Sequence, residues 1–460
     1  MYVGELVALP AGPRFALPWL LRYAVSPYRV WDALIRRYRD PVFIRLPESP
    51  GTVATGCPEG VRAIVSADAS TLVPWRLPST ELLLTNDSIF LQAGDRHRAV
   101  RKLLAPLFVP ARQAEHCATM AAVVDSELAQ LAPGPLVVQE LAQRMTLQII
   151  LAVLFGLRGG RHVAAFHDAA KRALDDAGPV YLYLRVLRKR FSAFAKTLRA
   201  LDDIKAMIQA ELERRRAAPA ACPAGHTDML DQLMRARHAD GSPLGDREIQ
   251  VHLSDMIVAG HETTTVAIAW TIYELCRNPH AMAALRDELD RHGPPRDAAT
   301  LAPLRYLEAA CNEALRLHPP LVFLSRTVAR PLHVSGHDVA PGFGVSLMLP
   351  VVHRNPATYP DPHAYRPERF VERSYGPDQF LPFGGGAKRC LGASFALQEM
   401  MIVVAGLVSR FDLRLRADRP VKARARTITV APVGGVEVVL TRRRPTPRAR
   451  PAPRDGSPAR

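Results

Sequence analysis

One cysteine of this chain stands in a setting that favours its thiolate form. Cys390 lies in the segment FGGGAKRCLG, residues 383–392, directly before a run of residues with helical apolar spacing. The free backbone N–H groups at a helix start and the charges of Lys388 and Arg389 all stabilise a thiolate. The glycines let the backbone turn tightly and let a bulky flat partner lie close to it. Because a lone cysteine is more often a small hydrophobic residue, Cys390 by itself leaves both interpretations open.

A second candidate for chemistry is the segment AGHETT, residues 259–264. Threonines within helices commonly hydrogen-bond to a carbonyl one turn earlier, which is the structural interpretation. In the functional interpretation, Glu262 and Thr263 form an acid–alcohol pair for proton delivery, because a hydroxyl that has donated its proton can regain one from a neighbouring carboxyl. The small residues Ala259 and Gly260 would then leave room beside the helix for dioxygen.

Basic side chains at helical spacing provide possible anion ligands. His97 and Arg101 lie four residues apart, so one helical face would carry both, and Arg326 follows the apolar run LVFLS. Arginine suits a carboxylate because its donors form a rigid fork. Glu313 and Arg316 are spaced for an ion pair within one helix, which contributes only a few tenths of a kcal/mol if exposed.

The elements that must position these residues are mostly helices. Apolar residues at helical spacing predict a long helix over residues 246–277, a second within 303–320 and a third from about 391 to 410. The segment 41–65 predicts two short strands and a helix beginning near Pro58, and TITVAPVGGVEVVL, residues 427–440, predicts a hairpin. The Ala/Pro-rich stretch 214–228 is interpreted as an exposed loop. One large, mainly α domain with a minor β portion is therefore expected.

Five positions around Cys390 match a known signature. Phe383, Gly386, the basic residue 388, Cys390 and Gly392 reproduce the pattern F-x-x-G-x-[HR]-x-C-x-G, with Lys388 where histidine or arginine is usual. With this segment the chain resembles the cytochrome P-450 superfamily of haem-thiolate proteins. The segments AGHETT, EALR, RPERF and GDRHRAVRKLLAPLF resemble further family motifs in the family's order. The resemblance spans residues of about 40 to 440.

The resemblance implies a fold, a cofactor and a set of site residues. It implies the cytochrome P-450 fold, with haem b between the central long helix and the cysteine loop, a haem domain over residues 1–440 and a disordered Arg/Pro-rich tail over 441–460. Cys390 would be the axial ligand of the haem iron, with Glu262 and Thr263 as the catalytic proton relay. A buried network of Glu313, Arg316 and Arg369 would fix the cysteine loop. The remaining cofactor-binding residues implied are His97, Arg101, Arg326, Lys388, Phe383, Gly386, Gly392, Ala259 and Gly260.

The family's substrate-recognition loops imply where a pocket would form. They correspond to residues of about 72–91, 180–184, 256–259 and 321–324 and to the hairpin tip. The pocket residues implied are Val258, Ala259, Val322, Phe323, Ile428 and Thr429. Because these stretches are apolar, a lipophilic small molecule is the expected substrate.

The resemblance also implies an activity: a monooxygenase of secondary metabolism that inserts one atom of dioxygen into its substrate by C–H hydroxylation or epoxidation. No flavin domain or dinucleotide fingerprint is present, so electrons are expected from a separate ferredoxin or flavodoxin and its reductase. The alternatives are a haem-thiolate isomerase, dehydratase or peroxygenase, against which Glu262 and Thr263 argue, and a haem sensor. A dependence of turnover on reduced nicotinamide would separate these classes.

The composition indicates the cellular location and the class of partner. Six scattered cysteines without zinc-type spacing favour a reducing cytoplasm, and the apolar run FALPWLL is too short to span a membrane. The formal charge is +16, but six of these charges come from the last twenty residues, which hold seven arginines and one aspartate. No nucleic-acid-binding motif accompanies the charge, so no nucleic-acid partner is expected. A monomer is predicted.

Overall fold

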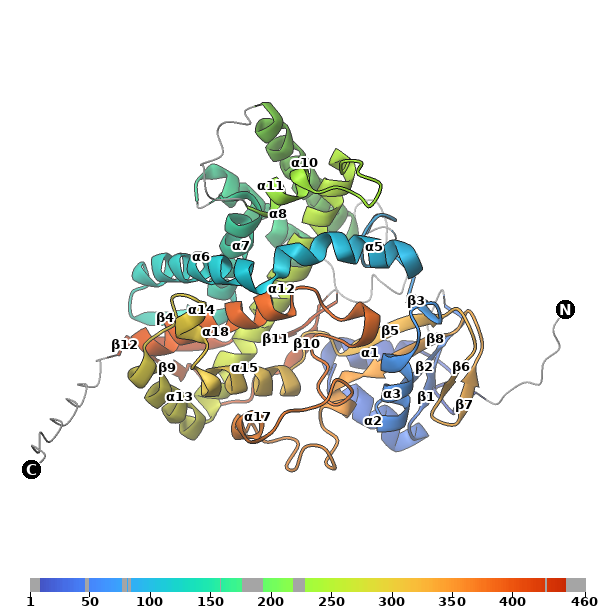
Figure 1. The fold of residues 1–460 in the computed structure, drawn as a ribbon. Coiled ribbons are helices and arrows are strands. Elements are labelled where there is room, and N and C mark those ends of the chain that lie inside the picture. Colours follow the sequence, from blue (N-terminus) through green and yellow to red (C-terminus); the bar gives the residue numbers. More distant parts are fainter. Residues whose placement is uncertain are drawn as a thin grey trace, which may run out of the picture.

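The computed structural model describes residues 9–45, 49–76, 81, 84–157, 159–175, 193–217, 228–426 and 428–443 (Figure 1). The α-helices are α1 (Leu17–Val25), α2 (Arg29–Tyr38), α3 (Pro58–Ser66), α5 (Gly94–Leu104), α6 (Pro110–Ala129), α7 (Val138–Phe155), α8 (Arg161–Asp175), α10 (Ala193–Ala217), α11 (Met229–Arg235), α12 (Asp246–Arg277), α13 (Pro279–His292), α14 (Ala298–Leu301), α15 (Arg305–Leu317), α16 (Leu349–Val352), α17 (Glu368–Glu372) and α18 (Ala393–Arg410). Short 3-10 helices are η1 (Ala105–Phe108) and η4 (Gly386–Lys388). The strands are β1 (Val42–Ile44), β2 (Thr52–Thr55), β3 (Leu72–Pro74), β4 (Gly134–Val137), β5 (Phe323–Val328), β6 (Leu332–Val334), β7 (His337–Val339), β8 (Gly344–Met348), β9 (Phe411–Leu415), β10 (Ala423–Ala425), β11 (Val430–Pro432) and β12 (Glu437–Arg442).

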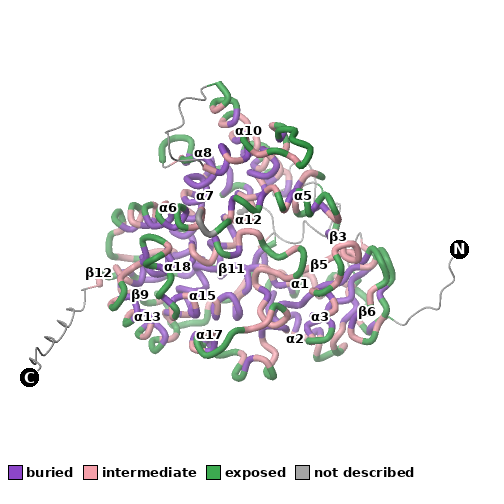
Figure 2. The backbone as a smooth tube through the Cα atoms, in the orientation of Figure 1, coloured by how far each residue is buried: buried purple, intermediate pink, exposed green. Residues whose placement is uncertain are grey.

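Helix α12 runs through the middle of the fold and is the element around which the others pack. It covers Asp246–Arg277, the range predicted from its apolar spacing, and it ends where Pro279 cannot continue it. It packs against α7, α10, α15 and α18 (Figure 1). Most of its second half is buried, as the tube in Figure 2 shows. A helix buried on most sides holds its side chains in fixed positions, which a site needs.

The largest sheet has five strands in the order β1-β2-β8-β5-β3. Strands β2 and β8 are parallel, and the other pairs are antiparallel. The two strands and the helix predicted within residues 41–65 are present as β1, β2 and α3. Strand β5 carries Arg326, so this sheet positions one of the expected anion ligands.

The predicted C-terminal hairpin over residues 427–440 is wrong. Strand β11 pairs with β10, whereas β12 lies between β4 and β9. Gly434, Gly435 and Val436 have φ between 64° and 78°, and this left-handed turn directs the chain away from β11. The alternating pattern fits a strand in either pairing, so the sequence alone did not identify the partners.

Two predicted boundaries shift. Strand β12 extends to Arg442, and Arg443 forms an ion pair with Asp290 at 2.6 Å, so the fold continues past residue 440. Residues 444–460, which make up most of the predicted tail, lie outside the described residues. Residues 214–217 of the predicted exposed loop belong to the last turn of α10, and residues 218–227 lie outside the described residues.

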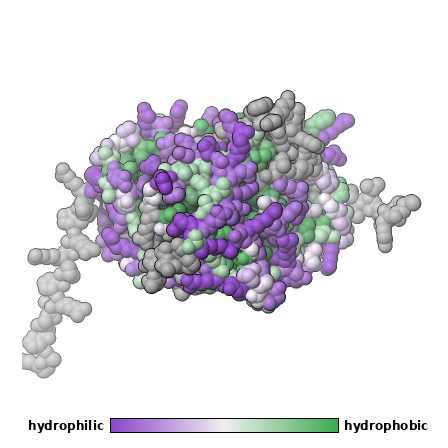
Figure 3. All heavy atoms as spheres, turned by 90° about the horizontal axis from the view of Figure 1, so that it is seen from above, coloured by the Kyte–Doolittle hydropathy of each residue, from purple (hydrophilic) through white to green (hydrophobic). Residues whose placement is uncertain are grey.

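Two helices, α7 and α18, are long and apolar enough to cross a membrane, but 78% and 67% of them, respectively, is buried inside the fold. Core helices of a globular domain have this character. The molecule seen from above has hydrophilic residues over most of its described surface, with hydrophobic residues in scattered patches (Figure 3).

Candidate functional site

The cysteine loop precedes α18 and is closed by its own backbone. The Cys390 N–H donates to the Phe383 carbonyl oxygen at 2.9 Å, and the residue keeps an open face to solvent although protein surrounds most of its thiol. The surrounding protein raises the pKa of the Cys390 thiol by withdrawing it from water. The Gly392 N–H and the charges of Arg101 and Arg389 act in the opposite direction. The sequence predicted a favoured thiolate, and the charges it relied on are present, but in the protein alone desolvation outweighs them.

The glycines of this loop are required for close packing with α3. Gly386 has φ of 62°, and a Cβ on it would lie 2.5 Å from the Val65 carbonyl oxygen, so no larger residue fits. A Cβ on Gly392 would make only an ordinary contact, 3.8 Å from the Phe108 ring. Gly386 therefore serves the packing of the loop on α3, and its predicted role in the approach of a flat partner stays a prediction.

Four basic side chains predicted from the sequence come together beside the cysteine loop: His97, Arg101, Arg326 and Lys388. They influence one another strongly. The pKa of His97 is lowered to about 4, first by burial and then by the charges of Lys388, Arg101 and Arg326. The pKa of Lys388 is lowered to about 7, first by burial and then by Arg326 and Arg101. Burial also lowers the pKa of Arg326.

This basic cluster has no acidic partner within the described part of the chain. Arg101 donates to the Arg389 carbonyl oxygen at 2.7 Å, and Arg326 donates to the Ser325 carbonyl oxygen at 2.7 Å. Neither they nor His97 and Lys388 form an ion pair with a described carboxylate. Buried positive charges without counter-ions are costly, so the cluster fits a ligand that carries carboxylates. The two propionates of haem b meet this need beside a cysteine that can bind its iron.

Lys388 has a role that the signature did not reveal. Its Nζ donates to the carbonyl oxygens of Gln92 at 2.5 Å and Ile89 at 3.3 Å. The ammonium therefore ties the cysteine loop to the segment before α5, in addition to its place in the basic cluster.

The acid and the alcohol of AGHETT have separate partners. Glu262 is buried, forms an ion pair with Arg426 at 3.0 Å and accepts from the Thr429 hydroxyl at 3.5 Å. The Thr263 hydroxyl donates to the Ala259 carbonyl oxygen at 2.7 Å, the back-bonding that the structural interpretation expected. Arg426 was not predicted as a partner of Glu262. Nothing in the sequence indicates that the residue after β10 lies next to the middle of α12.

Gly260 faces α7 in the fold. A Cβ at this position would lie 3.4 Å from Ile150 Cδ1, which is an ordinary van der Waals contact. Ala259 lies one residue earlier, about 100° around the helix. That these two small residues make room for dioxygen stays a prediction.

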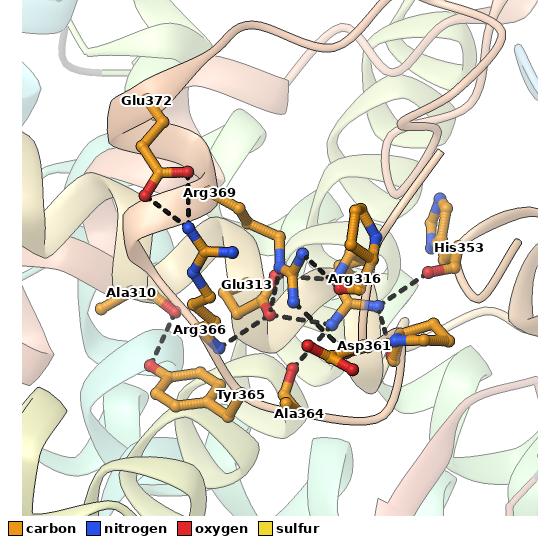
Figure 4. Close-up of polar contacts among 12 residues, drawn as sticks. Ala310, Glu313, Arg316, His353, Asp361, Ala364, Tyr365, Arg366, Arg369 and Glu372 are labelled. Atoms are coloured by element: carbon orange, nitrogen blue, oxygen red, sulfur yellow. Dashed lines mark hydrogen bonds and ion pairs between the residues drawn. The ribbon is translucent and has the colours of Figure 1, made fainter. Parts of the chain in front are cut away.

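The predicted network of Glu313, Arg316 and Arg369 is present and buried (Figure 4). Glu313 accepts from Arg316 at 2.7 and 2.8 Å and from Arg369 Nε at 2.9 Å. Arg316 also donates to the carbonyl oxygens of His353, Pro362 and Ala364. The network therefore fastens the irregular segment between α16 and α17, which leads on to the cysteine loop.

Comparison with known proteins identifies the family. Residues 15–436 match the family profile described as Cytochrome P450. The chain is a cytochrome P450. It is 28% identical over 454 residues to a Mycobacterium tuberculosis protein named cytochrome P450 135B1, covering 94% of this chain and 91% of that protein. It is 29% identical over 443 residues to another M. tuberculosis protein, named cytochrome P450 137, covering 92% and 88% of the two chains. A solved structure titled retinoic acid bound cyanobacterial CYP120A1 has the same fold, with a TM-score of 0.83 and 24% identity over 95% of this chain and all of that one.

Membership establishes the general chemistry of this P450. It is a haem-thiolate monooxygenase that binds haem b through a cysteine thiolate, and its fold is the one the motifs predicted. The basic cluster beside Cys390 is consistent with that cofactor.

The predicted pocket residues of this P450 do not all face the same space. The Phe323 ring packs on Tyr23 and Trp31, with ring centroids 5.9 and 6.0 Å away, in an apolar cavity beneath α1. Because side chains alternate along β5, the neighbouring Leu324 faces the other way, toward Gly384 in the cysteine loop. Phe323 therefore lines the cavity beneath α1, whereas Leu324 lies beside the cysteine loop, and the prediction that Phe323 contacts the substrate stays a prediction.

The other pocket candidates of the P450 lie at different depths. Val322 is buried in the core, Val258 on α12 is half-buried and Ile428 is 48% exposed. Thr429 is buried, with its hydroxyl on Glu262. Residues 180–184 of the predicted pocket lie outside the described residues, so that prediction stays untested.

Proposed function

We propose that Cys390 is the axial ligand of the haem iron and that His97, Arg101 and Arg326, with Lys388, hold the propionates. The observation that carries this proposal is the largely half-buried basic cluster without a described acidic partner, directly beside the family's cysteine. The bound propionates would also raise the pKa of His97 and Lys388 toward their usual values, because each gains an opposite charge.

We propose further that the reaction inserts one oxygen atom into a lipophilic small molecule, by C–H hydroxylation or epoxidation. In the hydroxylation, RH, dioxygen, two electrons and two protons give ROH and water. The bound haem supplies the oxygen activation. The protein excludes water, orients one carbon of the substrate and delivers the two protons. The retinoic acid named with CYP120A1 is a lipophilic molecule of the proposed class.

Thr263 and Glu262 are proposed to deliver these protons. Thr263 is half-buried, and its hydroxyl is oriented by the bond to Ala259. It can accept a proton from one side and donate on the other. Glu262 would return a proton to Thr263 after leaving its ion pair with Arg426. Arg426, which directly follows β10, therefore controls when the acid is available. Retention of this acid–alcohol pair favours a monooxygenase over an isomerase or a dehydratase.

We propose that electrons come from a separate ferredoxin or flavodoxin docked over the start of α5. The bond between Arg101 and the Arg389 carbonyl joins α5 to the cysteine loop. Arg389, Lys102 and Arg98 are exposed on this side, although Arg98 is paired with Asp95. Positive charge of this kind attracts an acidic partner and raises association rates by roughly 10- to 1,000-fold at low salt. A cytoplasmic location, which such partners require, stays a prediction.

The decisive experiment is the absorption spectrum of the reduced, carbon-monoxide-bound protein. A thiolate-type spectrum is expected for the wild type, and its loss is expected in Cys390→Ala and Cys390→His, because neither substitute donates comparable electron density to iron. The matched control is Cys276→Ala, which removes a cysteine that lies on α12 near β9. A thiolate spectrum that survives in both Cys390 variants would refute the assignment. A screen of lipophilic compounds for displacement of the iron's water ligand would then identify the substrate class.

A further inference from the structure

A short segment before α5 is held between the two halves of the site. Segment 88–92, called the strap here, has buried residues Ser88, Leu91 and Gln92. On one side it meets Asp255 of α12. The Ser88 hydroxyl donates to Asp255 Oδ1 at 2.9 Å, and the Ile89 N–H donates to Asp255 Oδ2 at 3.0 Å. Both oxygens of this carboxyl are therefore used by the strap.

On its other side the strap meets the cysteine loop. Lys388 donates to the Ile89 and Gln92 carbonyl oxygens. Ile89 is consequently held at both ends of its backbone, with its N–H on a carboxyl from α12 and its C=O on an ammonium from the cysteine loop. These two anchors fix the Ile89 peptide from opposite sides, so this junction is well defined.

The position of Asp255 on α12 connects the strap to the oxygen-handling residues. Asp255, Ala259 and Thr263 are spaced by four residues, so they form one stripe along the helix. The strap crosses the first turn of this stripe. It then leads through Gly94 into α5, which carries His97 and Arg101. A shift of the strap would therefore move a wall beside the proposed reaction site.

Burying the carboxyl of Asp255 costs more free energy than a merely structural contact would justify. It is 6% exposed, and no described cation pairs with it. Burial raises its pKa to about 7, while the bonds from Ser88 and Ile89 oppose that shift. An apolar residue at this helix position would avoid the cost of burying a carboxyl but could not fix the strap. The cost therefore fits a residue that specifies the position of its neighbour.

We propose that Asp255 is a positioning residue that limits substrate size by holding the strap against α12, with Lys388 as its second anchor. The inference rests on the proposed function, because Cys390 and Thr263 define where the substrate reacts. A substrate then has to fit between the fixed strap and the stripe of α12. Compact molecules pass this limit, and molecules with a rigid extension along α12 toward Asp255 do not.

Imidazole and 4-phenylimidazole test the proposal as probes of the ferric haem-loaded protein. Imidazole needs space only next to the iron, whereas the phenyl group extends into the pocket. In Asp255→Asn and Ser88→Ala we expect the association rate of 4-phenylimidazole to rise at least fivefold and that of imidazole to change less than twofold. Ser88→Thr, which restores a hydroxyl, should return the ratio toward the wild type. Asp95→Asn is the matched control, since Asp95 is an exposed carboxyl at the start of α5 paired with Arg98.

Amide hydrogen exchange supplies a readout that does not depend on the haem ligand. The Ile89 N–H should exchange at least tenfold faster in Asp255→Asn and in Ser88→Ala than in Asp95→Asn. If Asp255→Asn does not fold, Ser88→Ala decides, because it removes one bond and little volume. Unchanged Ile89 exchange together with an unchanged ratio of the two probes would overturn the proposal. An abnormal carbon-monoxide spectrum in the wild type would refute the proposed function instead.

Discussion

Replacing Glu313 by glutamine should destabilise the fold far more than its small volume change suggests. Glu313 is fully buried and is the sole carboxylate shown bonding to the guanidiniums of Arg316 and Arg369 among the described residues. Glutamine keeps the shape but removes the negative charge, so two buried cations lose their counter-ion. Breaking a buried ion pair by changing one partner costs about 3–5 kcal/mol.

The size of the effect on melting follows from the size of the protein. The unfolding entropy of a chain of this length is about 0.9 kcal/mol per kelvin, so a loss of ~4 kcal/mol lowers the melting temperature by about 4 °C. The purified holoprotein would be measured by calorimetry and by urea unfolding, together with its haem content. Haem content should also fall, because the network fixes the segment that leads to Cys390.

The matched control is Glu372→Gln, a few residues away. Glu372 accepts from Arg366, and both side chains are about half exposed, so the pair contributes little. We expect a change within about 0.5 kcal/mol for this variant. If Glu313→Gln were as stable as Glu372→Gln and retained full haem, the reasoning about the buried charges would be refuted.

Three further predictions concern the reaction, the partner and the pH. Thr263→Ala should bind haem and substrate nearly normally but divert electrons into peroxide or water, and an unchanged yield of product per electron would contradict its role in proton delivery. Reversing Arg98 and Lys102 to glutamate should slow the first electron transfer in low salt without shifting the substrate-binding spectrum, while the same reversal at exposed Arg416, which directly follows β9, should not; equal rates in all variants would exclude this docking face. The pKa of Asp255 is raised from 3.8 to about 7, so the stability contributed by its neutral form is present below pH 4 and is lost as the pH rises through 7. Between pH 5 and 8 the wild type should therefore lose up to ~2.7 kcal/mol more stability than Asp255→Asn, and parallel urea-unfolding profiles would show that the carboxyl does not titrate in this range.

The elements and the cofactor site were largely predictable because their signals are local. Helix α12 follows from an uninterrupted helical spacing that stops before Pro279, and α18 follows from a similar pattern. The cysteine motif is a contiguous ten-residue segment. The Glu313–Arg316 pair lies within one helical turn, so its existence was predictable, although its complete burial became a prediction only with the family resemblance.

The hairpin prediction that proved wrong, and the placements that the sequence left open, depended on distant partners. The strand over residues 437–442 was recognised, but its alternating pattern does not specify whether β11 or β9 lies beside it. The orientation of Phe323 depended on which residues of β5 point to each side of the sheet. A shift of one residue along the strand reverses the side to which a side chain points. The neighbour that a side chain at position 260 would meet could not be assigned without knowing that Ile150 lies opposite it.

The sequence by itself determined the helices, the cysteine motif and the family, because each depends on neighbours along the chain. Only the tertiary structure decided what surrounds the reactive groups. Asp255 meets the strap across more than 160 residues of sequence, and Arg426 meets Glu262 across a similar separation. Charge, burial and hydrogen bonding act through space, so the pKa of Asp255 and the partner of Glu262 are set by contacts that no local pattern encodes.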